Sequence, residues 1–163
     1  MIYNKYPLHE LIIHPRVRID YYKNKVDLEA FEKAFKASKN PVCYNGDIFT
    51  REEYNSFTER FPFVESIMVG RGVIGNPGLI GEVRDHVKMD KEKFKAFHDQ
   101  LLGEYEALKI GDRNTLFKMK ELWYYMIRNF EDTKKAEKMI KKAQTVEKYK
   151  EAVRMLLMGC EMK

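Results

Sequence analysis

Hydrophobic positions follow two different periods along the chain. Within residues 1–85, short apolar runs at 8–14, 41–44 and 66–69 alternate with segments whose apolar residues recur every three or four positions. Short apolar runs bounded by Pro, Asn or Gly are typical of buried strands, and the longer spacing is typical of helices. The order strand, helix, strand, helix, strand predicts parallel βαβ units.

Capping residues mark the expected starts of the two helices in this half. Asp27 directly precedes an apolar stripe that includes Phe31, and Asn40-Pro41 ends that stripe because proline disfavours helical geometry in the residue before it. Thr50 and Glu53 have the spacing of a capping box, in which each side chain bonds the backbone of the other residue. We therefore expect one helix to begin after Asp27 and another after Thr50.

From about residue 86 the strand-like runs stop and only helical spacing remains. Asp90 precedes one apolar stripe, and a second stripe follows Gly111. Two further helices are expected, over about 133–142 and from Thr145 onward. The pattern predicts a small antiparallel helical bundle.

The fold class expected is therefore α/β plus all-α, with two domains. The first covers residues 1–85 and the second residues 86–163. Three parallel strands cannot close into a barrel, and a complete (β/α)₈ barrel needs roughly 250 residues. The first domain is then either a small open α/β sheet or the final part of a larger barrel, and composition does not separate the two.

The positive charge of the chain is concentrated in its second half. Residues 1–85 carry 12 Lys and Arg against 12 Asp and Glu, whereas residues 86–163 carry 18 against 13, which accounts for the net charge of +5. A basic domain indicates an anionic partner, and nucleic acid is the commonest large one. A solvated, lysine-rich helical surface explains the same charge.

Composition excludes several other classes. Cys43 and Cys160 provide no disulfide framework, so a cytoplasmic location is expected. The apolar runs are far too short for a membrane span, and no set of residues predicts a metal site.

Each predicted strand ends in a cluster of polar or glycine residues. The clusters are His14-Pro15-Arg16-Val17-Arg18, Asn45-Gly46-Asp47 and Gly70-Arg71-Gly72. Ligands of parallel α/β folds bind at the carboxyl ends of strands, where glycine amides and an arginine suit a phosphate. Each cluster alone is also explained by an ordinary turn, and His14 by a structural role. The order of the three clusters is more specific than any one of them.

Four segments together resemble the closing third of the barrel of the tRNA-dihydrouridine synthase family, and a fifth resembles its basic-aromatic helix. The segments are residues 11–18, 22–24, 41–48, 67–77 and 118–125. The family reduces uridine in tRNA to dihydrouridine with FMN, which NADPH reduces. The resemblance implies a C-terminal part of a TIM barrel followed by a helical tRNA-binding domain.

The resemblance also implies roles for individual residues. The implied flavin contacts are His14, Asn45, Gly46, Asp47, Gly70 and Arg71, with the flavin phosphate between the turns after the last two strands. The implied tRNA contacts are Arg16, Arg18, Tyr22, Lys118, Lys120, Tyr125 and Arg128.

Other parts of the family pattern do not appear in this chain. The first five strands are absent, together with the cysteine that protonates uracil, and neither Cys43 nor Cys160 suits that role. We therefore expect no catalytic residue here and no activity from this chain alone. The missing barrel half, or a second copy of the chain, is expected to cover the open sheet edge. The alternatives are a stand-alone tRNA-binding module with a remnant barrel as scaffold, and a complete small phosphate-binding α/β protein.

Overall fold

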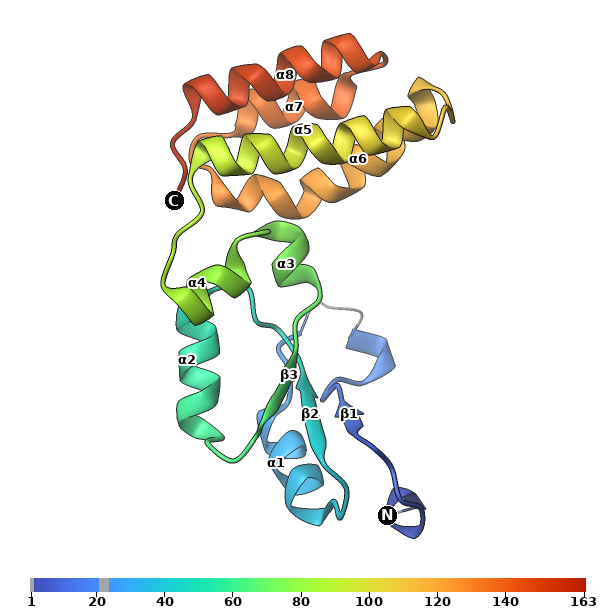
Figure 1. Cartoon of the computed structure of the whole chain (residues 1–163), viewed down its shortest axis with the longest axis vertical. Coiled ribbons are helices and arrows are strands. Elements are labelled where there is room, and N and C mark those ends of the chain that lie inside the picture. Colours follow the sequence, from blue (N-terminus) through green and yellow to red (C-terminus); the bar gives the residue numbers. More distant parts are fainter. Residues whose placement is uncertain (1, 21–23) are drawn as a thin grey trace. The chain divides into compact units, whose positions relative to one another are not determined.

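A computed structural model describes residues 2–20 and 24–163 and divides the chain into two compact units (Figure 1). We call Met1–Gly72 the α/β unit and Val73–Lys163 the helical unit. Among the described residues there are three strands and eight α-helices. The strands are β1 (Leu11–Ile13), β2 (Val42–Asn45) and β3 (Ser66–Met68), and the helices are α1 (Leu28–Ala37), α2 (Arg51–Arg60), α3 (Arg71–Gly75), α4 (Leu79–Asp85), α5 (Lys91–Ala107), α6 (Asp112–Met126), α7 (Lys134–Lys142) and α8 (Val146–Gly159).

The α/β unit is built on a parallel sheet with the strand order β1-β2-β3, which confirms the three predicted parallel strands. Its register aligns Ile13 with Tyr44 and Tyr44 with Ile67. Helices α1 and α2 pack on the face that carries these three residues (Figure 1). The Tyr44 ring stacks on Phe57 with 3.8 Å between centroids and meets Phe31 edge-on at 4.9 Å. This aromatic core holds β2 in a fixed position.

The opposite face of the sheet carries apolar side chains that remain accessible to solvent. Ile12 is 47% exposed and Met68 is 42% exposed, whereas Cys43, which aligns with Ile12 on the neighbouring strand β2, is buried. Among the described residues β1 and β3 each pair only with β2, so both outer edges are open. Parallel sheets normally have both faces covered.

Four helices of the chain begin at the residues that the sequence predicted as caps. The side chain of Asp27 accepts a hydrogen bond from the Ala30 amide at 2.9 Å, and Thr50 and Glu53 form the complete capping box. The side chains of Asp90 and Thr145 each accept a bond from the third residue of the helix that follows. Each bond satisfies an amide that the helix itself leaves without a partner.

In the helical unit, α5, α6, α7 and α8 share one hydrophobic core (Figure 1). Phe94, Met119, Trp123, Tyr149 and Leu156 lie at its centre, each no more than 3% exposed. Gly111, just before α6, has a φ of 83°, a left-handed conformation that glycine adopts without strain. These four helices correspond to the four predicted from the apolar stripes.

The short helices α3 and α4 were not predicted from the sequence. The division into compact units falls between Gly72 and Val73, and the domain bounds expected from the sequence, 1–85 and 86–163, stay a prediction. The amide of Asn129 donates to the Gly75 carbonyl at 2.6 Å, which ties α3 to the end of the α6 segment. The residues after Gly72 therefore belong structurally with the helices.

No helix within the described ranges combines the length and the apolarity that crossing a membrane requires.

Candidate functional site

Three strand ends of the α/β unit are joined by one carboxylate. Asp47, just after β2, accepts hydrogen bonds from Arg16 Nη2 at 2.5 Å and from Arg71 Nη2 at 2.6 Å. Arg16 follows β1 and Arg71 follows β3, so the pairs link all three strands. The side chains of Asp47 and Arg71 are about one quarter exposed, whereas that of Arg16 is 3% exposed. We call these residues, with His14, the strand-end cluster.

The imidazole of His14 belongs to the same electrostatic environment. Its pKa lies below the ordinary value because burial disfavours the charged ring and because Arg16 and Arg71 repel a further positive charge, which outweighs the opposing attraction of Asp47. His14 is therefore neutral at pH 7, with one ring nitrogen to donate and one to accept a hydrogen bond. The cluster carries two guanidinium charges against one carboxylate, a surplus of one positive charge.

The other predicted flavin contacts lie at the same strand ends, with differing local roles. The amide of Asn45 donates to the Met68 carbonyl at 3.0 Å and so ties the end of β2 to that of β3. A Cβ atom on Gly46 would lie 1.9 Å from the Tyr44 hydroxyl, so close packing explains this glycine. At Gly70 the same construction meets nothing within 4 Å. Gly70 therefore lies beside space that a ligand can enter.

The cluster suits an anion that carries several oxygen atoms. Guanidinium groups bind phosphate through paired hydrogen bonds, and glycine lets the backbone approach such a ligand closely. Arg71 also lies over the ring of Phe49, 5.4 Å from its centroid, which further restricts its position. These donors therefore suit a phosphate group, and the flavin contacts implied by the resemblance stay predictions.

Three residues of the α/β unit were predicted to contact tRNA, and their surroundings differ. Arg16 belongs to the strand-end cluster, and its buried guanidinium also donates to the Asn24 carbonyl at 2.6 Å. Arg18 opens the short 3-10 helix Arg18–Asp20 and is exposed. Tyr22 lies outside the described residues. Of the three, Arg18 has the exposure that contact with a large partner needs, and the roles themselves stay predictions.

Four residues on α6 and the turn after it were predicted as tRNA contacts, and two of them are partly buried. Lys120 is partly buried and donates to the Ala143 carbonyl at the end of α7, at 2.5 Å. Tyr125 is half-buried and meets Tyr124 edge-on. Lys118 and Arg128 are exposed, Lys118 beside Glu121 at 3.7 Å and Arg128 over the Tyr124 ring. Of the four, Lys118 and Arg128 are therefore the two exposed side chains, and the four roles stay predictions.

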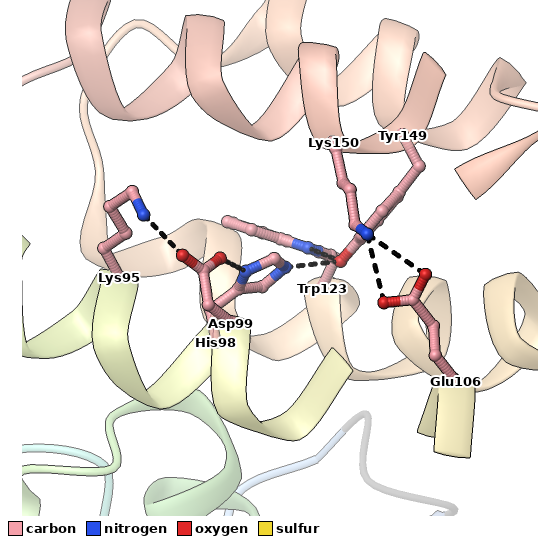
Figure 2. A network of polar contacts seen from close by, with 7 residues as sticks. All are labelled: Lys95, His98, Asp99, Glu106, Trp123, Tyr149 and Lys150. Carbon is pink, nitrogen blue, oxygen red and sulfur yellow. Dashed lines mark hydrogen bonds and ion pairs between the residues drawn. The ribbon is translucent and has the colours of Figure 1, made fainter. Parts of the chain in front are cut away.

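A polar network that the sequence did not predict lies inside the helical unit (Figure 2). His98 Nδ1 contacts Asp99 at 3.0 Å, and its Nε2 lies 2.7 Å from the Tyr149 hydroxyl. The Trp123 ring nitrogen donates to the same hydroxyl at 2.6 Å. If His98 Nδ1 donates to Asp99, the Tyr149 hydroxyl donates to Nε2, and every proton in the chain of bonds has an acceptor.

The order Asp99, His98, Tyr149 is similar to a proton-relay arrangement, but burial assigns it a structural role. His98 is 1% exposed and Tyr149 is 0% exposed. Burial lowers the pKa of His98 and raises that of Tyr149, so both side chains stay neutral at pH 7. The network ties α5, α6 and α8 together through three side chains that lie far apart in the sequence.

Neither cysteine is placed as an exposed acid or nucleophile. Cys43 is 4% exposed and Cys160 is 8% exposed. Burial raises the pKa of the Cys43 thiol, which remains protonated near neutral pH. Both behave as small buried hydrophobic residues.

Comparisons with known proteins find one family. The dihydrouridine synthase (Dus) family matches residues 7–160. A probable tRNA-dihydrouridine synthase of Rickettsia bellii is 31% identical over 100 residues, which cover 59% of this chain and 30% of that protein. A probable tRNA-dihydrouridine synthase 1 of Synechocystis is 31% identical over 126 residues, covering 71% of this chain and 34% of that protein.

The relatives are much longer than the matched region. A tRNA-dihydrouridine(16) synthase of Pseudomonas syringae is 30% identical over 74 residues, 45% of this chain and 23% of that protein. The chain thus spans about a quarter to a third of the length of these relatives. Because the family match extends over nearly every residue, this chain belongs to the dihydrouridine synthase family.

Proposed function

We propose that this chain provides the phosphate end of an FMN site and part of the RNA-binding surface for the reduction of uridine in tRNA. The observation that carries the proposal is the convergence of Arg16 and Arg71 on Asp47 at the carboxyl ends of three parallel strands. Such strand ends are where α/β folds bind ligands. The names of the relatives supply the substrate, tRNA, and the reaction.

The residues present fit the phosphate of FMN. Arg71 and the open backbone beside Gly70 would hold the phosphate, Arg16 would supply additional positive charge, and neutral His14 would exchange a hydrogen bond with the ligand. Asn45 fixes the two neighbouring strand ends relative to each other. Bound FMN, itself reduced by NADPH, would supply the hydride that saturates the uracil ring.

We place the three strands in the closing part of a (β/α)₈ barrel. The two open sheet edges and the exposed Ile12 and Met68 on the uncovered face support this placement, because a completed barrel covers all of them. The rest of the barrel, or a second copy of the chain, would provide the cover. The four core helices α5–α8 then form the helical tRNA-binding domain of the same protein.

The proposal requires the proton donor for the reduction to come from outside the described residues. The product gains a hydride on one ring carbon and a proton on its neighbour, so a positioned acid is needed. Cys43 and Cys160 are both buried, so neither thiol is accessible to donate that proton. We therefore expect this chain alone to bind ligands without reducing uridine.

The test compares FMN with riboflavin, which has the same ring and sugar chain but no phosphate. Quenching of flavin fluorescence by the purified chain should show FMN bound about ten-fold more tightly or better, the range of a charge-assisted contact. Arg71→Ala should abolish this preference, whereas Arg84→Ala, an exposed arginine paired with Asp85, should leave it unchanged. Equal affinities of the unmodified chain for FMN and riboflavin would contradict the phosphate assignment.

A second candidate function is a tRNA-binding module without a working flavin site. The basic surface favours it independently, because α7 exposes five lysines and only Lys141 pairs with a carboxylate within the described part of the chain. Binding to tRNA that weakens steeply as salt rises is expected under both functions. Strong tRNA binding together with no preference for FMN would select this second function.

A further inference from the structure

The helical unit has a surface hollow beside the first half of α6 whose lining is unusual in its charge. The hollow has a volume of about 710 Å³, within the range of about 300–1,000 Å³ typical of small-ligand sites. Its lining residues come from α6 and from the segment between α7 and α8. They are Arg113, Asn114, Leu116, Phe117, Lys120, Ala143 and Gln144.

The hollow contains two cations, and no carboxylate among the described residues lines it. Arg113 is exposed and has no ion-pair partner in the part of the chain that the structure describes. Lys120 is positioned by its bond to the Ala143 carbonyl. The nearest carboxylate in sequence, on Asp112, instead accepts a hydrogen bond from the Val146 amide at 3.1 Å. The hollow therefore attracts anions.

An aromatic ring and two amides accompany these cations. Phe117 is 66% exposed, so much of its ring is accessible to a ligand. The amide nitrogens of Asn114 and Gln144 donate to the carbonyls of Ile110 and Lys142, so each side chain keeps its oxygen as an acceptor. A ring for stacking, amides for a base edge and cations for phosphate are the components of nucleotide recognition.

A second hollow in the same unit has a lining of different charge. That hollow, about 370 Å³ between α5 and α8, is lined by two carboxylates, Asp99 and Glu106, and by three cations, Lys95, Lys150 and Arg154. Lys95 pairs with Asp99, and Lys150 pairs with Glu106 at 3.0 Å (Figure 2). Four of these five charges are therefore paired with one another, and the lining contains no exposed phenyl ring.

We infer that the hollow beside α6 binds one unpaired nucleotide of an RNA strand. The base stacks on Phe117 with its edge toward Asn114 and Gln144, and the adjoining phosphates contact Arg113 and Lys120. This inference rests on the proposed function in RNA binding and adds to it a preference for a single-stranded or looped nucleotide over a duplex. Duplex bases are stacked on one another and do not offer a free face to a protein ring.

The experiment measures binding of a short fluorescent oligouridylate and of a duplex RNA of the same length by anisotropy, with the full chain. Phe117→Ala should weaken binding of the single strand about ten-fold and change duplex binding little. Phe117→Trp should preserve single-strand binding, whereas Phe117→Leu should not, because leucine keeps the apolar volume but loses the flat ring. Phe63→Ala is the matched control, since Phe63 is 82% exposed in the α/β unit and should have no effect.

A second pair of variants tests the charge. Arg113→Glu should reduce binding of the single strand more than Arg154→Glu, which makes the same change beside the second hollow. Single-strand binding that is equal in Phe117→Ala and the unmodified chain overturns the inference while leaving RNA binding intact. No binding of tRNA by the unmodified chain overturns the proposed function, and the inference falls with it.

Discussion

The two units both contain a polar cluster that joins three elements, and the clusters differ in exposure. In the α/β unit Asp47 and Arg71 are each about one quarter exposed at the strand ends. In the helical unit His98 and Tyr149 are at most 1% exposed and form bonds inside the core. Residue types alone do not separate the two, since each contains a histidine and an aspartate. Access to solvent separates a cluster that can meet a ligand from one that holds helices together.

The largest expected effect comes from a substitution of Gly46, the residue before Asp47 of the strand-end cluster. Gly46→Ala places a methyl group where the Tyr44 hydroxyl lies, and Tyr44 is 1% exposed and stacked on Phe57, so the ring cannot move aside. We expect a loss of about 3 kcal/mol in the free energy of unfolding, measured by urea denaturation. Gly70→Ala is the control and should cost less than about 1 kcal/mol, because its Cβ meets open space. Equal losses for the two variants would show that Tyr44 does not restrict this turn.

The corresponding change in the helical unit removes the centre of its buried network. His98→Ala leaves a cavity and deprives the Tyr149 hydroxyl of its acceptor, so we expect destabilisation by about 2 kcal/mol or more. Trp123 is the only tryptophan and bonds to Tyr149, so its fluorescence reports unfolding of this unit. Lys95→Ala removes only the exposed pair with Asp99 and should cost less than about 0.5 kcal/mol. A small effect of His98→Ala would mean that the network is not structural.

Lowering the pH should destabilise the helical unit because of the same histidine, His98. Burial lowers the pKa of His98, so the folded state keeps the ring neutral while the unfolded chain binds a proton below about pH 6.5. The unfolded state then holds more protons, and stability declines as the pH falls below that value, by at most about 1.4 kcal/mol per pH unit from this residue. Unfolding midpoints followed by Trp123 fluorescence from pH 7.5 to pH 5 should show this decline, and His98→Gln should flatten it.

The smallest effect separates two neighbouring lysines of α6. Lys120→Met removes the donor to the Ala143 carbonyl, which we expect to cost about 1 kcal/mol. Lys118→Met removes an exposed pair with Glu121 and should change stability by less than about 0.5 kcal/mol. Denaturation curves of the two variants provide the comparison. A larger stability loss for Lys118→Met would reverse the assignment of which lysine is structural.

Local features were predictable from the sequence, and contacts between distant residues were not. The helix starts at Asp27, Thr50 and Asp90 depend on residues three positions apart, so their capping patterns were visible. Helices α3 and α4 were missed because their segment is rich in glycine and contains Pro77, which reads as turns.

The polar clusters show the same limit. Tyr149 lies 51 residues after His98, and no local pattern marks that pair. The three strand-end clusters were predicted as a group because their order follows the strands, but the pairing of Arg16 with Asp47 required the fold. Phe117 was not among the candidate residues predicted from the sequence, and its exposure appears only once α6 is oriented.

The bridging position of Asp47 has a consequence for any anion that reaches the strand ends. An arginine side chain held in one geometry has already lost its rotational freedom during folding, so a ligand does not have to immobilise it on arrival. By restraining two guanidinium groups at once, a single carboxylate transfers that entropic cost from the binding step to the folding step. The carboxylate of Asp47 also neutralises part of the positive charge of the two guanidinium groups. We therefore expect anions with more than one negative charge to bind more tightly than anions with a single charge.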